Sequence, residues 1–189
     1  MPKRRMISIA ACLVCPLLLV AGVASSQNVI ESNTPTRPRD VIFVPTREPV
    51  ADAMMRLANV TKDDVVYDLG CGDGALVIAA AKRGARAVGV DIDPDRIKEA
   101  TEKVRAAGVQ DRVTLIRGDI FDPQIKISEA SVVTLYLLQS LNEKLKPRLK
   151  SELAKGSRVV SHAFSMGADW PAEKTETVDG TNVYLWTVE

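Results

Sequence analysis

The stretch Val65-Val66-Tyr67-Asp68-Leu69-Gly70-Cys71-Gly72-Asp73-Gly74, followed by an Ala-rich run that ends at Lys82, decides the fold. The β-branched run at 65–69 predicts a short strand, and the Ala-rich run at 75–82 predicts a helix. The glycines between them allow the backbone to approach a ligand closely, and the start of the helix turns its amide groups toward the same point. The segment therefore predicts a strand, a ligand-binding loop and a helix.

Strands and helices alternate along the rest of the chain. Further runs predict strands at 87–90, 113–116, 132–137 and 159–163, and helices at 46–60, 94–107 and 147–153, with Thr46 as N-cap of the first of these helices. At the C-terminus, 175–178 and 183–188 flank a turn with no helix between them, which predicts an antiparallel hairpin. We therefore expect an α/β fold with a Rossmann-like, doubly wound, mostly parallel sheet and an antiparallel C-terminal hairpin.

Residues 1–26 have the pattern of an export signal. Lys3, Arg4 and Arg5 precede an apolar stretch at 6–23, and small residues follow at 24–26. The apolar stretch also has almost the length that crosses a bilayer, so an uncleaved membrane anchor is the alternative. In both cases the positive flank predicts a body exported to the periplasm or anchored on that side. The polar, Pro-containing residues 27–40 predict an extended linker, which leaves the globular domain at 41–189.

The composition excludes several classes of protein. A chain of 189 residues with 46% hydrophobic and 26% charged side chains is typical of one soluble domain, not of a disordered or coiled-coil protein. Lys3, Arg4 and Arg5 belong to the 25 basic residues, so the rest of the chain has 22 against 24 acidic ones, which argues against a nucleic-acid partner. Beyond residue 26, Cys71 and His162 stand alone as cysteine and histidine, so we expect no metal site.

Two ligands fit the glycine loop by spacing. Gly70, Gly72 and Ala75 satisfy the dinucleotide fingerprint, and Asp91 follows Gly72 at the distance of a ribose-binding acid. An NAD-binding protein is therefore one interpretation. In that case the loop would have to approach a pyrophosphate group.

The charges around the loop favour a cationic ligand. Asp68 and Asp73 bracket the loop, and carboxylates so close to a pyrophosphate would weaken its binding. S-adenosylmethionine carries a sulfonium and an ammonium group, which suit such a loop. Asp119 follows the predicted strand at 113–116 and is placed to accept a hydrogen bond from the adenine amine, and Asp91 can accept both ribose hydroxyls. We therefore expect S-adenosylmethionine as the cofactor.

Three motifs resemble those of the class I S-adenosylmethionine-dependent methyltransferases: Asp-x-Gly-x-Gly-x-Gly at 68–74, Gly-Val-Asp-Ile-Asp at 89–93 and Gly-Asp-Ile at 118–120. The resemblance covers about residues 41–163. More narrowly, Phe43-Val44-Pro45-Thr46, the segment 67–74, and Thr134-Leu135-Tyr136-Leu137 followed by Ser140 resemble bacterial relatives of the mitochondrial lysine methyltransferases. Those enzymes act on the adenine nucleotide translocase and the ATP synthase c-subunit. They are tethered to a membrane by an N-terminal apolar segment, which residues 6–23 match.

The resemblance implies a cofactor-binding set. The loop residues would line the methionine part, the carboxylates would contact its amino group, the ribose and the adenine amine, and two isoleucines would enclose the adenine. A threonine hydroxyl would reach the cofactor carboxylate, together with nearby N–H groups. In the order of the chain, these residues are Thr46, Asp68, Gly70, Cys71, Gly72, Asp91, Ile92, Asp119 and Ile120.

The acceptor side is predicted from the strand ends. Transfer from a sulfonium is an in-line displacement, so the protein chiefly has to align a nucleophile and exclude water. Tyr136, Ser140 and His162 come at or just after the ends of two predicted strands, where they could line a pocket that lowers the pKa of a lysine. Each also has a structural interpretation as a packing or core residue. An Asn-Pro-Pro-Tyr motif is missing at 134–137, which disfavours DNA bases and leaves a protein or small-molecule acceptor.

The localisation and the cofactor are in conflict, because an exported body would meet little S-adenosylmethionine. Either the apolar segment is an anchor with the body on the cytoplasmic side, or the chain is an exported, non-catalytic module that binds a nucleoside or adenosyl ligand. The intact Asp68, Gly70, Gly72, Asp91 and Asp119 favour an active enzyme. We therefore expect a methyltransferase that acts on a nucleophilic nitrogen, with a protein lysine as the candidate acceptor.

Overall fold

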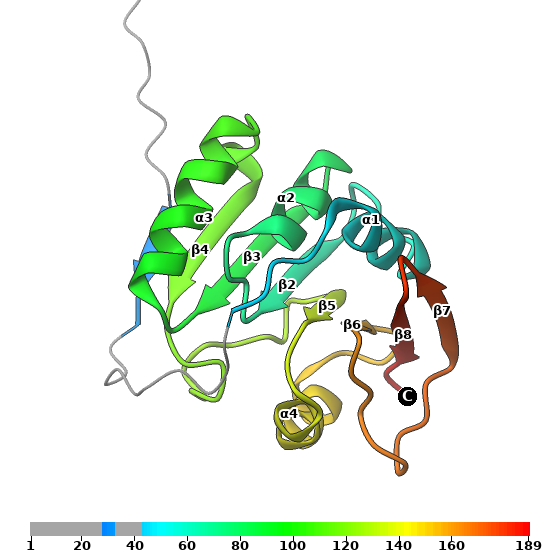
Figure 1. The fold of residues 1–189 in the computed structure, drawn as a ribbon. Coiled ribbons are helices and arrows are strands. Elements are labelled where there is room, and N and C mark those ends of the chain that lie inside the picture. Colours follow the sequence, from blue (N-terminus) through cyan, green and yellow to red (C-terminus); the bar gives the residue numbers. More distant parts are fainter. Residues whose placement is uncertain (1–27, 33–42) are drawn as a thin grey trace, which may run out of the picture.

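The computed structural model describes residues 28–32 and 43–189 (Figure 1). The predicted export signal or anchor at 1–26 lies outside these residues, as does most of the predicted linker at 27–40. No helix in the described part of the chain is both long enough and apolar enough to span a bilayer.

The described residues form one mixed sheet with strand order β1-β4-β3-β2-β5-β6-β8-β7. The strands are β1 (Asn28–Glu31), β2 (Val65–Leu69), β3 (Arg86–Asp91), β4 (Val113–Arg117), β5 (Val132–Leu135), β6 (Arg158–His162), β7 (Lys174–Val178) and β8 (Thr181–Thr187). The helices are α1 (Glu48–Leu57), α2 (Ala75–Lys82), α3 (Pro94–Ala106) and α4 (Gln139–Glu152), with a 3₁₀ turn, η1 (Gln110–Arg112), before β4. The predicted fold class is confirmed.

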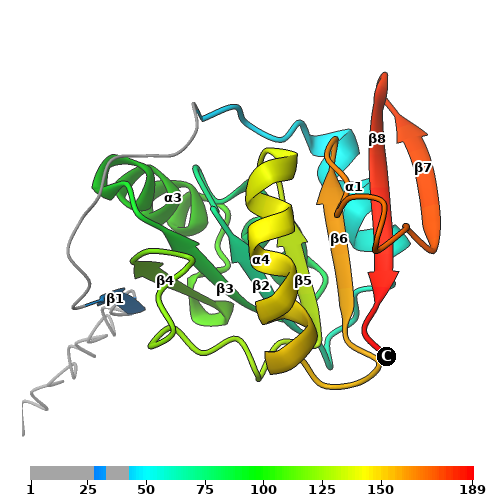
Figure 2. The same ribbon diagram turned by 90° about the horizontal axis from the view of Figure 1, so that it is seen from below.

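Helices cover both faces of the sheet. Figure 1 shows α1, α2 and α3 on one face and α4 on the other, and Figure 2 shows α4 in front of the strands. A buried apolar cluster lies on each side, one around Met54, Val77 and Ile97 and the other around Leu135 and Leu149. The two clusters explain why the central strands consist almost entirely of apolar residues.

The strand order reverses beside β2. The chain leaves β2 for β3 and β4 on one side, and later returns to β2's other side with β5 and β6, all in parallel. A crevice opens outside the carboxyl ends of the strands at such a reversal, and ligands of open α/β sheets bind there. The C-terminal hairpin is confirmed: β8 pairs with β6 antiparallel, and β7 forms the edge of the sheet.

Three local predictions differ from the structure. A strand, β1, forms within the segment predicted as a linker, and it pairs in parallel with β4. The N-cap of α1 is Arg47, because the Thr46 hydroxyl is turned toward His162 instead of the helix. The helix α4 begins at Gln139, well before the predicted start at Pro147.

Burial explains why α4 runs through its proline. An interior proline costs a helix about 3 kcal/mol because it removes a hydrogen bond and crowds the preceding turn. Leu145 and Leu149 lie one turn apart on the buried face of α4 and are fully buried against the sheet. Burying two leucines stabilises the helix by roughly 3 to 6 kcal/mol, which offsets the proline.

Candidate functional site

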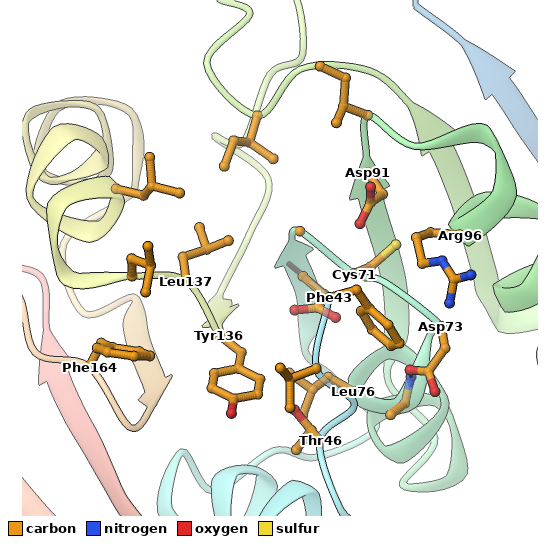
Figure 3. A pocket seen from close by; sticks show the side chains of 18 of the residues that line it. Phe43, Thr46, Cys71, Asp73, Leu76, Asp91, Arg96, Tyr136, Leu137 and Phe164 are labelled. Atoms are coloured by element: carbon orange, nitrogen blue, oxygen red, sulfur yellow. Dashed lines mark hydrogen bonds between the residues drawn. The ribbon is translucent and has the colours of Figure 1, made fainter. Parts of the chain in front are cut away.

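A cavity of about 230 Å³ opens at the carboxyl ends of β2, β3 and β5. Figure 3 shows its lining side chains converging from the glycine loop, from the segment before α1 and from the start of α4. Its lining divides into an acidic part near β2 and β3 and an apolar part near β5 and α4. The lining residues are Phe43, Val44, Thr46, Asp68, Gly70, Cys71, Asp73, Ala75, Leu76, Asp91, Ile92, Arg96, Asp119, Ile120, Tyr136, Leu137, Leu138, Leu141 and Phe164.

The glycine loop is tied to the end of β3. The amides of Gly70 and Cys71 both donate to the carbonyl of Val90, at 2.8 and 2.9 Å, and the amide of Gly72 donates to the Asp91 carboxylate at 2.8 Å. Gly70 has a φ of +89°, which a residue with a side chain rarely adopts. The loop therefore has a fixed shape, and it presents Gly70 and Cys71 to the cavity.

Gly72 does not line the cavity, in contrast to its predicted role. The ring of Phe43 covers it, and a Cβ built on Gly72 would lie 2.3 Å from Phe43 Cε2. The missing side chain of Gly72 thus makes room for an aromatic ring of this chain.

The Cys71 side chain is buried between the loop and β3. Its Sγ would lie 2.9 Å from a Cβ on Gly89, so the thiol fills the space that this glycine leaves open. Burial is the main cause that raises the pKa of the Cys71 thiol well above its ordinary value. A protonated, buried thiol is a packing group rather than a nucleophile.

Asp68 is the most deeply buried carboxylate of the cavity, with 1% of its surface exposed. Its Oδ1 accepts a hydrogen bond of 2.7 Å from the Thr134 hydroxyl on the neighbouring strand β5. Burial raises the pKa of Asp68 to about 7, the nearby charges of Asp91 and Asp73 add to the shift, and the Thr134 hydrogen bond opposes it. An opposite charge from a ligand would stabilise the ionised form.

Asp91 and Asp119 lie at the end of β3 and in the loop after β4. Asp91 accepts from the amides of Gly72 and Asp93, at 2.8 and 2.9 Å, and burial raises the pKa of its carboxyl group. Asp119 Oδ1 accepts from the amide of Phe121 at 2.9 Å. Backbone amides thus fix the direction in which both carboxylates point.

Asp73 already has a cationic partner within the chain, so it contributes less negative charge to the cavity than the sequence suggested. Lys103 on α3 donates to Asp73 Oδ2 at 2.6 Å, and the same ammonium pairs with Glu99 at 2.9 Å. Because a lysine already pairs with Asp73, the acidity of the cavity rests mainly on Asp68 and Asp91.

The apolar end of the cavity is built around Tyr136. Its ring stacks on the His162 ring with centroids 3.7 Å apart, and the Phe164 ring lies 6.4 Å away. His162 does not line the cavity, and its Nδ1 lies 3.5 Å from Thr46 Oγ1. Burial, with the charge of Arg47 as a second cause, lowers the pKa of His162 to about 4, so this ring is neutral at pH 7.

Ser140 lies apart from the cavity. It is exposed on the first turn of α4 and is absent from the lining, whereas Leu141, the next residue, is part of it. The helix therefore turns Ser140 away from the predicted acceptor site.

Phe164 is a lining residue that the sequence did not reveal. It follows Ala163, whose φ of +66° turns the chain sharply after β6. The buried Asn142 of α4 donates to the Phe164 carbonyl at 3.1 Å, and the Ser161 hydroxyl donates to it at 2.7 Å. The sequence does not predict that a non-glycine residue such as Ala163 adopts a positive φ. The turn that brings Phe164 to the cavity could therefore not be predicted.

Other missed residues come from segments whose sequence carries no ligand motif. Phe43 and Val44 precede α1, Arg96 lies on the first turn of α3, and Leu138 and Leu141 start α4. Within the described part of the chain, no group of His, Cys, Asp or Glu side chains could hold a metal ion.

Comparisons with known proteins identify relatives of this chain. The model of the ANTKMT methyltransferase domain matches residues 68–174. A protein-lysine N-methyltransferase of Saccharolobus islandicus is 45% identical over 153 residues, which cover 78% of this chain and 94% of that protein. The mouse lysine N-methyltransferase of the ATP synthase c-subunit is 29% identical over 122 residues, or 65% of this chain and 48% of that protein.

A solved structure supplies the cofactor. An RNA methyltransferase from Salinibacter ruber in complex with S-adenosyl-L-homocysteine is 51% identical, with a TM-score of 0.73, and covers 77% of this chain and 94% of that one. S-adenosylhomocysteine is what remains of S-adenosylmethionine after methyl transfer. The carboxylates of the cavity fit S-adenosylmethionine because it carries two cationic groups, a sulfonium and an ammonium. On these grounds the chain belongs to the family of the ANTKMT methyltransferase domain and is an S-adenosylmethionine-dependent methyltransferase.

Proposed function

We propose that the chain transfers a methyl group to the side-chain nitrogen of a lysine in a protein. The observation that carries the proposal is the division of the cavity: its carboxylates lie near β2, β3 and the loop after β4, and the end near α4 is formed by Tyr136, Leu138, Leu141 and Phe164. An apolar environment lowers the pKa of an amine, and aromatic rings attract an ammonium group. The protein-lysine N-methyltransferase of Saccharolobus islandicus, 45% identical over nearly its whole length, supports the same acceptor.

We further propose that the acidic end binds the cofactor. Asp91 would accept the ribose hydroxyls, Asp119 the adenine amine, and Ile92 and Ile120 would enclose the adenine ring. Gly70 and Cys71 would line the methionine part, while Asp68 would face its ammonium group and Thr46 its carboxylate. Each of these residues lines the cavity in the structure. Gly72 would act indirectly, through its hydrogen bond to Asp91.

In this mechanism S-adenosylmethionine supplies a methyl group on a sulfonium, which is an activated leaving group. The residues of this chain then have to align the amine, keep it neutral and exclude water. Tyr136 would form the wall along which the lysine side chain enters. His162 lies behind Tyr136 and holds its ring by stacking, so we assign it a positioning role, and Ser140 has no role in the cavity.

RNA is the second candidate acceptor, because the 51% identical protein from Salinibacter ruber is an RNA methyltransferase. The cations of α4 offer an RNA only part of their charge, since two of the four pair with carboxylates. Lys144 lies over Phe121, Lys150 over Trp170, Lys146 pairs with Asp169, and Arg148 pairs with Glu152. The carboxylates offset the charges of Lys146 and Arg148, whereas Lys144 and Lys150 keep theirs over neutral rings, so this helix has a reduced positive charge for phosphate binding.

The two acceptors are separated by one labelling experiment. The full-length chain is incubated with S-adenosylmethionine labelled on its methyl group and with matched protein and RNA fractions from the source cells. Label that resists ribonuclease and is recovered as methyl-lysine after acid hydrolysis supports the proposal, whereas label recovered in nucleosides refutes it in favour of RNA. Asp91→Asn is the inactive control, and Ser140→Ala should transfer label as well as the natural chain does.

We also propose that residues 1–26 either direct export or anchor the domain to a membrane. The basic residues before the apolar stretch at 6–23 support this proposal. Reporter domains fused on either side of residue 26 would test export: activity of a periplasm-specific reporter supports it, and activity of a cytoplasm-specific reporter refutes it and leaves an anchor with the domain on the cytoplasmic side. Mass spectrometry of the mature N-terminus would separate a cleaved signal from an anchor.

A further inference from the structure

The segment 43–47, which we call the strap, forms one side of the cavity. Phe43, Val44 and Thr46 line the cavity, and Figure 3 shows Phe43 and Thr46 reaching it from this segment. At its far end the strap is fastened to the turn between β7 and β8. Arg47 pairs with the Asp179 carboxylate at 2.7 Å and donates to the Asp179 carbonyl at 2.8 Å.

The other end of the strap is fastened by the ring of Phe43. The ring lies on Gly72, where a Cβ would approach Phe43 Cε2 to 2.3 Å and Cδ2 to 2.7 Å. Contacts this close mean that no residue larger than glycine is compatible with the ring in this position. The strap and the glycine loop are therefore complementary surfaces.

A cation on α3 also contacts the ring. The guanidinium carbon of Arg96 lies 4.8 Å from the centroid of Phe43, which is within the range of a cation–π contact. Arg96 pairs with Glu99, Glu99 pairs with Lys103, and Lys103 pairs with Asp73 of the glycine loop. This chain of ion pairs fixes the guanidinium next to the loop on which the ring lies.

We propose that Phe43 is a cofactor-retaining residue and that Arg96 positions its ring. The ring lines the same cavity as Gly70, Cys71 and Asp91, so an adenosyl ligand bound there lies against the strap. Such a ligand leaves once the ring moves off Gly72 and breaks its contact with Arg96. The pair therefore sets the rate at which the product S-adenosylhomocysteine dissociates. This inference rests on the placement of the cofactor in the cavity proposed above.

The dissociation rate of S-adenosylhomocysteine from the full-length chain tests the proposal, measured by stopped-flow displacement. Phe43→Ala should accelerate release by about tenfold, equivalent to about 1.4 kcal/mol, because it removes a half-buried ring from the ligand. Arg96→Ala should accelerate release by roughly threefold, as expected for one partly exposed cation–π contact. Lys150→Ala is the matched control, since it removes a cation from the Trp170 ring away from the cavity, and it should leave the rate unchanged.

The coupling between the two residues separates retention from a general loss of structure. In the Phe43→Leu background, which keeps apolar bulk but offers no aromatic face, Arg96→Ala should have no further effect on the rate. An unchanged rate in Phe43→Ala, or fully multiplicative effects of the two substitutions, would overturn the proposal. No acceptor is needed here, so a chain that retains S-adenosylhomocysteine through Phe43 and yet leaves lysine unmethylated refutes only the proposed acceptor.

Discussion

Replacing Asp68 by asparagine should stabilise the unliganded protein and at the same time weaken cofactor binding. Asp68 is almost fully buried, and burial raises its pKa from 3.8 to about 7. At 1.36 kcal/mol per pKa unit this difference corresponds to about 4 kcal/mol, an upper bound on what ionisation of Asp68 costs the fold. The amide oxygen of an asparagine at this position could still accept the hydrogen bond from Thr134, so the substitution removes the charge and keeps the contact.

The sign of the pH dependence follows from proton uptake. Between about pH 4 and pH 7 the folded chain holds a proton on Asp68 that the unfolded chain has lost, so this group lowers stability as the pH rises. Urea denaturation at pH 4 and pH 8 should therefore show equal stabilities at the lower pH and a more stable Asp68→Asn variant at the higher pH. Calorimetric titration at pH 8 should show weaker binding of S-adenosylmethionine to that variant, because the neutral amide no longer attracts its cationic groups.

Thr134→Val is the matched control, since it removes the hydroxyl that favours the ionised form of Asp68. In that variant the pKa of Asp68 should rise further, and the pH at which the natural chain gains affinity for S-adenosylmethionine should rise with it. The reasoning fails if Asp68→Asn is less stable than the natural chain at pH 8, or if the stability difference between the two does not change with pH.

Three further predictions follow from the same site. Asp91→Ala should abolish detectable binding of S-adenosylmethionine in calorimetry, and retained affinity would contradict the assignment of Asp91 to the ribose. The same substitution should lower the melting temperature, because the amides of Gly72 and Asp93 lose their acceptor. Gly89→Ala should destabilise the fold by about 1 to 3 kcal/mol in urea denaturation, because the new Cβ would lie 2.9 Å from Cys71 Sγ and 3.0 Å from Leu115 Cδ2. An unchanged denaturation midpoint would show that the thiol can move aside. Cys71 in the native chain should react with iodoacetamide at pH 8 far more slowly than Cys71 in the urea-unfolded chain, because burial raises the pKa of its thiol. Peptide mass spectrometry measures the two rates, and equal rates would mean that the loop opens readily.

The parts of the site that the sequence predicted are those built by local rules. Gly70 and Asp91 belong to one strand-loop-helix unit and to the strand beside it, so spacing along the chain is enough to bring them together. Asp93 lies directly before α3 and caps it, with its carboxylate accepting from the amide of Asp95. Such signals act over a few residues and do not depend on the rest of the fold.

The parts that the sequence did not predict depend on helix phase and on distant contacts. The distance of Ser140 from the end of β5 suggests a place in the acceptor site, but α4 buries the face that carries Leu145 and Leu149, and Ser140 is exposed. A proline is typical of the first turn of a helix, so the sequence predicted a start at Pro147, whereas Pro147 lies inside α4. Phe43 reaches the cavity through a contact with Gly72, which lies 29 positions later in the chain, and no pattern within either segment predicts that contact.

The carboxylates of Asp68 and Asp91 at the strand reversal link stability to function. An unpaired charge in an apolar environment is unfavourable, and Asp68 and Asp91 both have raised pKa values in the unliganded structure. A ligand that brings positive charge to these groups removes part of that penalty, whereas a neutral or anionic ligand of similar shape does not. The same burial that weakens the empty fold therefore provides selectivity, because the free energy recovered on binding depends on the charge of the ligand. The glycine loop alone could not discriminate in this way, since its spacing also fits a dinucleotide. The charge beneath the loop, rather than the loop itself, distinguishes this site from a dinucleotide site.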